Sequence, residues 1–275
     1  MPERRSRLRL HPSDSVTAPM SPRVPSWLRS LGPLVQVGLR QRYAGSWLGS
    51  IWAILGPLVE VAAYVALFSL LLPSEEGADH FSFALHVAAG LLPWVSFREA
   101  VDGAALIMTE NRWIRRSSVP LELLVARQVG LSGVRGLVGL LLVLATAALA
   151  GRAPGVAGFA LPFVGLALQL VATYGISLGV APLAVVFPDL RPGLASALTL
   201  LTFASPIVFP ESIAGERVLA LLEWNPYTHF LRLFRASLTP APASSLWVSA
   251  LAAATALGAG HFARHRLWWV ARDRL

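Results

Sequence analysis

Long runs of apolar residues dominate this sequence and decide what it can fold into. A helix of about 20 apolar residues spans the hydrocarbon core of a bilayer. Six runs approach or exceed that length: 47–72, 81–105, 129–150, 155–186, 194–209 and 244–263. Only 14% of the 275 residues are charged, against about 25% in an ordinary soluble domain. The sequence therefore predicts an all-α polytopic membrane protein with six transmembrane helices across 47–263, and it argues against a soluble enzyme.

The segments outside this transmembrane domain differ in character. Residues 1–24 are rich in Arg, Pro and Ser and lack the apolar core of a signal peptide, so we expect a disordered cytoplasmic tail. Residues 25–46 place apolar side chains at helical spacing and arginines at other angles, which predicts an amphipathic helix in the membrane surface. We expect Pro33 to break this helix, and a plain connecting helix is the alternative. Residues 264–275 form a basic cytoplasmic tail.

The arginines are distributed unevenly between the two sides of the predicted membrane. Seventeen fall on the side of the N-terminus and the C-terminal tail, and four fall on the opposite side. Cytoplasmic loops carry an excess of positive charge in membrane proteins. Both termini are therefore expected in the cytoplasm, as an even number of spans requires. This topology also accounts for the net charge of +8, so no nucleic-acid partner is expected.

Two residue types that many enzymes need are missing from the chain. It contains no lysine, which excludes a P-loop lysine and a Schiff base, and no cysteine, which excludes thiol nucleophiles and thiolate metal sites. The six histidines are scattered and form no HExxH motif. We therefore expect no catalytic residue, no metal and no cofactor in this chain, and any ATP must bind to another chain.

Charged residues inside the apolar runs are the next informative feature. Glu60 lies near the middle of the first run, where a charge is costly unless it faces protein or water. It is either an interhelical hydrogen-bonded contact or a polar point on a transport path. Arg98, Glu99 and Asp102 lie near the predicted cytoplasmic end of the second run, where they can pair with one another or meet water.

Aromatic residues lie deeper in the first two runs than an interfacial belt requires. Trp52 and Tyr64 are in the first run, and Trp94 and Phe97 are in the second. Aromatic faces stack on sugar rings, so these side chains are candidates for a sugar path. Packing between helices is the alternative interpretation.

The loop at 110–123 is the best candidate for an interaction surface. It combines a basic, helix-like stretch with a Ser-Ser-Val-Pro stop at residues 117–120. A cytoplasmic loop does not need Trp113 and Ile114 for solubility, and exposed apolar residues between arginines suggest docking onto a partner. A solvated loop at the membrane interface is the alternative.

Two further patterns bear on helix packing. The semi-polar stretch 210–242 predicts two short helices that divide at Asn225-Pro226. Gly175 and Gly179 lie four residues apart, a spacing of small residues that lets membrane helices approach closely.

The stretch RYAGSWLGSIWAILGPL at 42–58 carries a family resemblance. The matching positions are Arg42, Tyr43, Ser46, Leu48, Gly49, Trp52 and Pro57, and further matches in order are Gly90, Pro93, Trp94, Asn111 with Pro120, Asp189, Ser205-Pro206 and Asn225-Pro226. The set resembles the transmembrane subunits of ABC exporters for polysaccharide, O-antigen and teichoic acid. The resemblance covers about 30–240.

This resemblance implies a complete transport assembly. It implies a surface helix before the first span, a coupling helix between spans 2 and 3, and short re-entrant helices between spans 5 and 6. Two copies of the chain would form the channel, and two copies of a separate ATPase would bind ATP and Mg and drive export. The implied substrate is a lipid-linked glycan that crosses the cytoplasmic membrane.

The resemblance also suggests roles for particular residues. The substrate headgroup would meet Arg40, Arg42 and Tyr43, and the translocation path would include Trp52, Glu60, Tyr64, Trp94 and Phe97. Coupling to the ATPase would use Asn111, Trp113, Ile114, Arg115, Arg116 and Pro120. An ABC permease for a drug or a lipid is the nearest alternative function, and a membrane glycosyltransferase or lipid phosphatase is a more distant one.

The chain departs from the family pattern at two places. Val37 and Gly38 stand where relatives often have Arg-Asp, and Pro188 precedes Asp189 where relatives often have an arginine. Salt bridges that such arginines make in relatives are therefore not expected here.

Overall fold

The computed structural model describes residues 26–42, 80–110, 119–151, 155–207, 209–211 and 214–274, with separate positions between 45 and 66. Every regular element in these residues is a helix. In chain order they are α1 (Ser26–Arg42), η1 (Gly49–Ile51), α3 (His80–Glu110), α4 (Leu121–Leu149), α5 (Val156–Val186), α6 (Leu190–Phe203), α7 (Glu216–Trp224), α8 (Pro226–Phe234), η4 (Arg235–Ser237) and α9 (Ala243–Arg274). The all-α prediction is confirmed for this part of the chain.

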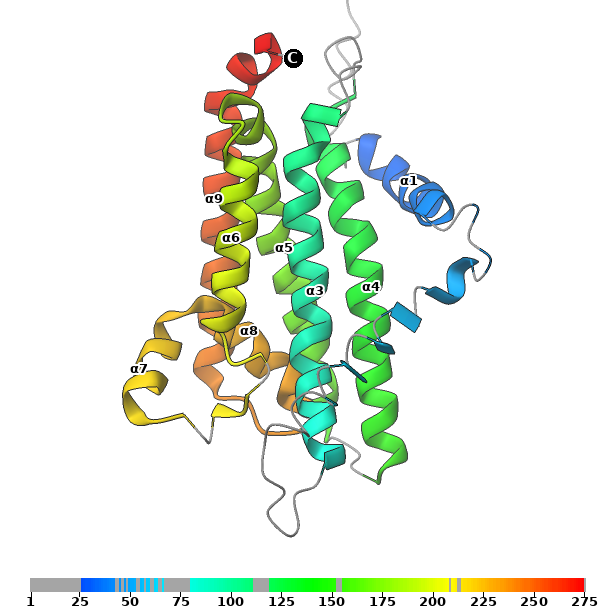
Figure 1. Ribbon diagram of the computed structural model, residues 1–275, viewed down its shortest axis with the longest axis vertical. Helices are drawn as coiled ribbons and strands as arrows, with labels where there is room; N and C mark the ends of the chain where they lie inside the picture. The colour runs from blue at the N-terminus through cyan, green and yellow to red at the C-terminus, as the bar shows by residue number, and fades with distance from the viewer. Residues whose placement is uncertain are drawn as a thin grey trace, which may run out of the picture.

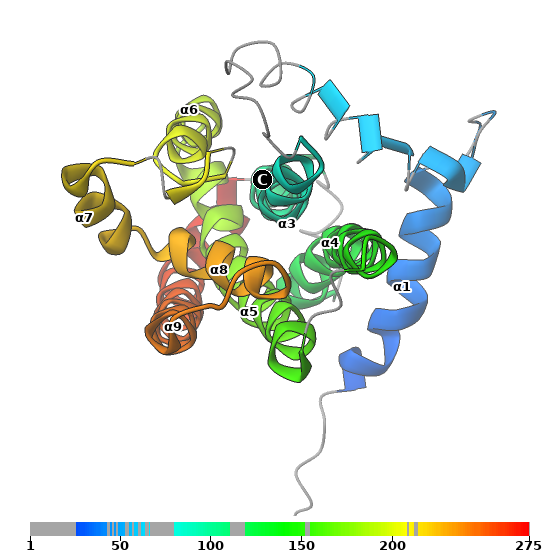
Figure 2. The same ribbon diagram turned by 90° about the horizontal axis from the view of Figure 1, so that it is seen from below.

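Four long helices run side by side along the long axis of the molecule. α3, α5 and α9 run one way and α4 runs the other, with the shorter α6 beside them (Figure 1). α1 lies on the outside of the bundle against α4 (Figure 2). We call the end where α3 stops and α9 finishes the arginine end, and the opposite end, which holds α7 and α8, the α7 end (Figure 1).

Three of the described helices, α4, α5 and α9, are long and apolar enough to cross a membrane. α6 has 14 residues, fewer than the roughly 20 that a perpendicular crossing requires. The predicted boundaries of the fifth span, 194–209, are wrong: the helix starts at Leu190 and ends at Phe203, ahead of a turn that contains Pro206. Most of the predicted first span lies outside the described residues, so six spans remain a prediction.

Close contact between α5 and α9 depends on glycine. A Cβ atom on Gly260 would lie 1.9 Å from the Gly175 carbonyl oxygen, and one on Gly175 would lie 2.4 Å from the backbone of Ala256. No side chain fits at either position, which confirms that Gly175 permits close approach. The other predicted position, Gly179, has more room, since its Cβ would lie 3.4 Å from that of Ala263.

α4 packs through glycines that the sequence analysis did not single out. Gly130, Gly133, Gly136 and Gly139 recur every third residue. A Cβ at Gly139 would meet the Leu92 side chain of α3 at 2.8 Å. The spacing keeps one face of α4 narrow, so α3 and α5 both approach it closely.

α1 is continuous, and the predicted break at Pro33 is wrong. The helix runs from Ser26 to Arg42 with Pro33 inside it. A proline in a helix interior costs about 3 kcal/mol, so other contacts must hold the turns that follow it. The Val35 side chain reaches the α4 backbone at Gly130, and Gly38 is buried against α4. The N-terminal part of α4 therefore supports α1 beyond the proline.

The stretch 210–242 forms two nine-residue helices, α7 and α8. α7 ends at Trp224, and the Asn225 side chain accepts a hydrogen bond from the Tyr227 backbone N–H at 2.9 Å, which caps α8. Pro226 occupies the first turn, where its missing N–H costs nothing. The division thus falls where the sequence predicted it, while re-entry into a membrane stays a prediction.

α9 continues beyond the predicted end of the last span. It runs unbroken to Arg274, so the stretch 264–274 forms the last turns of this helix. Arg264 pairs with Glu122 at the start of α4, and Arg274 donates a hydrogen bond to the Val186 carbonyl at 2.8 Å. These contacts attach the end of α9 to the arginine end of the bundle.

Candidate functional site

A cluster of arginines gathers where α1 meets α3 and α4. Arg42 at the end of α1 donates a hydrogen bond to Glu99 of α3 at 3.1 Å, and Arg135 of α4 pairs with the other oxygen of the same carboxylate. Arg127 of α4 donates to the Leu34 carbonyl and to the Gln41 side chain at 3.4 and 3.3 Å. We call Arg42, Glu99, Arg127 and Arg135 the arginine cluster.

The local chain explains how Arg42 reaches this position. α1 ends at Arg42, inside the predicted amphipathic stretch 25–46, and Gly45 follows with a φ of +80°. That conformation is in the left-handed region that favours glycine. The chain therefore turns at Gly45, soon after the end of α1. Arg40 is exposed on the same helix, and Tyr43 lies outside the described residues.

The arginine cluster carries more positive than negative charge. Arg42 and Arg135 both pair with the Glu99 carboxylate, and the hydrogen bonds described for Arg127 go to uncharged acceptors. The side chain of Arg42 is 40% exposed. Guanidinium groups form strong, forked hydrogen bonds with carboxylate and phosphate oxygens. The cluster is therefore suited to receive an anion, and the anion would compete with Glu99 for Arg42.

The aromatic candidates occupy two different environments. Trp94 and Phe97 are 1% and 7% exposed. Both contact Tyr227 of α8, with ring centroids 4.8 and 5.3 Å apart. Within one copy of the chain these two side chains pack between helices, which is the alternative that the sequence left open. Trp52 is 43% exposed.

Other candidates for the path and for coupling fall mainly outside the described residues. Glu60 and Tyr64 are among them, and so are the coupling candidates Asn111, Trp113, Ile114, Arg115 and Arg116. Pro120 is described and is the N-cap of α4. Because α3 ends at Glu110 and α4 begins at Leu121, the connection between them starts and finishes at the arginine end.

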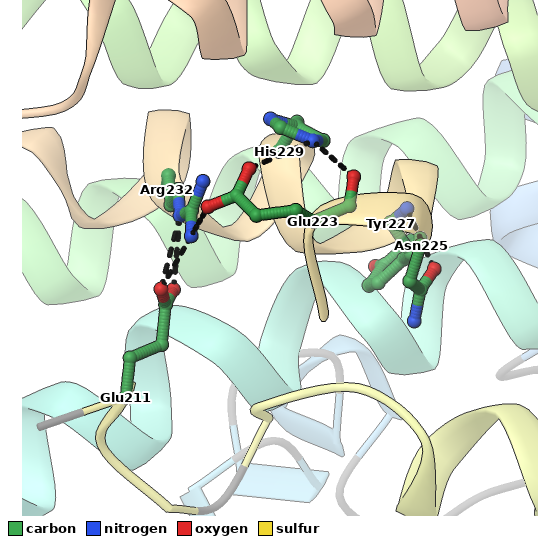
Figure 3. Close-up of polar contacts among 6 residues, drawn as sticks. All are labelled: Glu211, Glu223, Asn225, Tyr227, His229 and Arg232. Atoms are coloured by element: carbon green, nitrogen blue, oxygen red, sulfur yellow. Dashed lines mark hydrogen bonds and ion pairs between the residues drawn. The ribbon is translucent and has the colours of Figure 1, made fainter. Parts of the chain in front are cut away.

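A second charged network at the α7 end was missed by the sequence analysis. Arg232 of α8 lies between two carboxylates, with shortest distances of 2.6 Å to Glu211 and 2.5 Å to Glu223 (Figure 3). The Nε2 atom of His229 lies 3.1 Å from the Glu223 carbonyl oxygen. Hydrogen bonds from Arg232 lower the pKa of Glu223, and those to Glu211 and Glu223 raise the pKa of Arg232. This network fixes α7 and the 209–211 segment to α8.

Arg235 lies next to this network and is buried, with 3% of its surface exposed. It donates to the Pro206 and Ile207 carbonyls at 2.7 Å each and to the His86 carbonyl at 3.3 Å. The topology predicted from the sequence places Arg235 outside the six spans, in the stretch 210–242. The signal that could have found it is the pattern FLRLFR at 230–235, which places two arginines among large apolar residues.

The acidic and histidine side chains of the described residues are the groups that could bind a metal. No group of three His, Asp or Glu side chains gathers there. The charged networks at both ends consist of arginine–carboxylate pairs, in which the carboxylate oxygens are occupied by guanidinium donors.

Taken together, the helices and the cluster define a class: an all-helical membrane protein with a cationic surface at one end. No protein-family model matches the chain. It is 31% identical over 206 residues to an O-antigen export system permease protein of Myxococcus xanthus, covering 74% of this chain and 77% of that protein. A Klebsiella pneumoniae protein of the same name is 23% identical, over 72% and 75%. The polysialic acid transport protein of Escherichia coli is 24% identical, over 74% and 78%.

The chain belongs to the family of ABC-type O-antigen and polysaccharide export permeases. The family resemblance stated from the sequence is therefore confirmed. Members named by these comparisons are transport proteins, which agrees with a permease rather than an enzyme.

Proposed function

We propose that this chain is the channel-forming subunit of an exporter that moves a lipid-linked polysaccharide, such as an O-antigen or a teichoic-acid-like polymer, across the cytoplasmic membrane. The observation that carries the proposal is the 31% identity to an O-antigen export permease over 77% of that protein's length. The polysialic acid transport protein supports the same substrate class, because polysialic acid is also a polysaccharide.

The arginine cluster is the proposed receptor for the substrate headgroup. A lipid-linked glycan that carries a pyrophosphate presents several anionic oxygens at the membrane surface. Arg40 and Arg42 would bind these oxygens, with Tyr43 as a further contact, and Arg135 would keep Glu99 paired when Arg42 is drawn away. The exchange requires little rearrangement, because Arg42 is partly exposed at the end of its helix.

The energy for transport would come from a second protein. A chain without lysine has no P-loop lysine, so ATP and Mg would bind to a separate ATPase present in two copies. Two copies of this chain would form the channel, with Trp52, Glu60 and Tyr64 along the path. The 110–123 segment would pass the motion of the ATPase to the helices, since α3 and α4 both terminate beside it.

The proposed orientation places the arginine end in the cytoplasm. The end of α3, the start of α4 and the end of α9 lie at this end (Figure 1), and the last turns of α9 contain Arg264, Arg266, Arg272 and Arg274. The positive-inside rule then assigns both termini to the cytoplasm and the α7 end to the opposite surface.

Deletion of the gene in its host, with complementation, tests this function. We expect the deletion strain to lose surface polysaccharide and to accumulate lipid-linked glycan on the cytoplasmic side, and the parental gene to restore export. Unchanged surface polysaccharide with loss of export of a drug or of another lipid would contradict the proposal and support the alternative permease function.

A further inference from the structure

A large apolar pocket lies between α5, α6, α8 and α9, away from the arginine cluster. Its volume is about 430 Å³. Its wall includes Phe97 of α3, Ile176 of α5, Leu201 of α6 and Ala256 of α9. An apolar cavity of about 150 Å³ already stays dry and binds an aromatic hydrocarbon. A cavity of this size has room for a longer hydrocarbon segment.

The polar side chains on the wall leave little for a polar ligand to bind. Gln169 accepts a hydrogen bond from the Tyr227 hydroxyl at 3.1 Å and donates one to the Pro93 carbonyl at 3.0 Å. Asn225 donates to the Ala204 carbonyl at 3.0 Å and to the Ser205 hydroxyl at 2.8 Å.

The fourth polar wall residue, Thr255, donates within α9, to the Leu251 carbonyl at 2.9 Å. Every polar side chain on the wall therefore has a partner in the protein, and none of the residues that line the pocket is charged. The chemistry of the pocket selects an apolar occupant.

The pocket opens where the protein faces hydrocarbon. Thr255 and Ala259 line it and are also exposed along α9, one of the helices suited to cross a membrane. At 1.5 Å per residue they lie about 18 and 24 Å from the start of α9, inside the roughly 30 Å core of a bilayer. On the outer surface of the same helix, Leu251 and Phe262 are 65% and 62% exposed.

α7 identifies the leaflet from which an occupant would come. It stands away from the bundle, beside α8 (Figure 1), and its Leu221 and Trp224 are 71% and 87% exposed. Trp at such a position is typical of a membrane–water interface. Asn225, the next residue, already belongs to the pocket wall. A lipid with its headgroup near α7 thus has its acyl chains at the level of the pocket.

We propose that this pocket binds one acyl chain of a membrane phospholipid from the leaflet at the α7 end. The chain would fill the space between α6 and α9 and support α6, which is short and has few contacts with the other helices. A lipid pyrophosphate is disfavoured here, because its headgroup needs cations and the arginine cluster lies at the opposite end.

Photocrosslinking in proteoliposomes tests the site with a defined probe. The full-length protein is reconstituted with phosphatidylethanolamine that carries a diazirine in one acyl chain, and crosslinked residues are mapped by mass spectrometry. We expect labelling of Phe97 and Ile176 on the wall as well as of Leu251 and Phe262 on the outer surface. Labelling of the outer surface alone would overturn the proposal.

Two variants that fill the pocket make the test specific. We expect Ala259→Trp to reduce wall labelling about tenfold, which corresponds to about 1.4 kcal/mol of lost binding, and to leave labelling of Phe262 unchanged. Ala254→Trp, on the same helix but outside the wall, is the matched control and should have no effect. Leu201→Trp fills the pocket from α6 and should act like Ala259→Trp.

Two outcomes would contradict the acyl-chain site. The first is equal wall labelling in the parental protein and in both filled variants. The second is stronger wall labelling by a diazirine-bearing polyprenyl pyrophosphate than by the phospholipid. Neither outcome would affect the proposed export function, which is tested by surface polysaccharide.

Discussion

The two ends of the bundle use arginine in opposite ways. At the arginine end, Arg42 and Arg135 share the single carboxylate of Glu99, and Arg42 is 40% exposed. At the α7 end, Arg232 has two carboxylates, and Arg235 is buried among backbone carbonyls. The first arrangement leaves positive charge for a ligand, whereas the second commits its arginines to the protein itself.

This difference distinguishes arginines that can bind a ligand from arginines that stabilise the fold, and it does not depend on any related protein. An anion at the arginine cluster gains a forked donor and leaves Glu99 still paired with Arg135. An anion at Arg232 would have to displace carboxylates that are already well placed. The arginines of the α7 end should therefore matter for stability, and those of the arginine end for transport.

The largest expected effect comes from reversing charge at the proposed coupling segment. Arg115→Glu with Arg116→Glu should nearly abolish export and ATPase copurification while leaving the protein in the membrane, because it reverses the charge of the proposed docking surface. Arg152→Glu with Arg217→Glu makes the same change in net charge on the side predicted to face away from the cytoplasm. This double variant should preserve both export and ATPase copurification. Equal loss in the two double variants would remove the functional distinction between the ends.

Replacing the buried arginine should have the largest effect on stability. Arg235→Met leaves the Pro206 and Ile207 carbonyls without their donor, and each unsatisfied buried group costs about 1–3 kcal/mol. We expect a loss of about 3 kcal/mol or more, measured as thermal unfolding in detergent. Arg217→Met is the control because Arg217 is exposed on α7. Equal stability of the two variants would show that the α7 end does not depend on this arginine.

Removing the shared carboxylate should strengthen anion binding at the arginine end. Glu99→Gln frees Arg42 from its ionic partner, so we expect about tenfold tighter binding of geranylgeranyl pyrophosphate, or about 1.4 kcal/mol. Titration in nanodiscs measures this affinity. Asp102→Asn makes the same charge change one turn along α3 and should have a smaller effect. Weaker binding by Glu99→Gln would mean that Glu99 positions Arg42 for the ligand rather than competing with it.

The smallest effect concerns pH at the α7 end. Arg232 lowers the pKa of Glu223, so their ion pair stabilises the fold at pH values above the unfolded-state pKa of about 4.3. This stabilisation is lost as the pH falls through the lower pKa that Glu223 has in the folded protein. Glu223 is more than half exposed, so Glu223→Gln should cost at most about 1 kcal/mol at pH 7. Thermal unfolding at pH 7 and pH 3 should show this difference shrinking at the acidic pH, and a constant difference would contradict the pairing.

Helix location was predictable because it depends on local pattern. The apolar runs predicted the position of α5 and the C-terminal end of α4, and the cap and turn chemistry of Asn225-Pro226 predicted the division between α7 and α8. The start of α4 was predicted wrongly: the helix begins at Leu121, inside the segment expected to be a loop, and not at 129. The end of α1 near Arg42 also followed from local residues. Each of these features is encoded within a few turns of the chain.

The pairings between distant residues were not predictable. Arg42 and Glu99 are 57 residues apart, and which of Arg98, Glu99 and Asp102 faces α1 depends on how α3 rotates against its neighbours. The burial of Arg235 depends on the carbonyls of Pro206 and Ile207, in the turn that follows α6. Pro33 does not break α1 because α4 contacts the helix at Val35 and Gly38, in the turns that follow the proline.

The most direct test of the account compares lysine and alanine at Arg42. Both variants are reconstituted with the ATPase, and transport of the lipid-linked glycan is measured together with membrane insertion. If Arg42 binds the headgroup, Arg42→Lys inserts normally but transports below the parental rate, because lysine lacks the forked geometry of arginine. Arg42→Ala loses about 1.5–3 kcal/mol of headgroup binding, which is roughly a ten- to hundredfold loss of affinity. Transport at the parental rate by Arg42→Lys, with only reduced insertion of Arg42→Ala, would show that Arg42 anchors α1 to lipid and that the headgroup binds elsewhere.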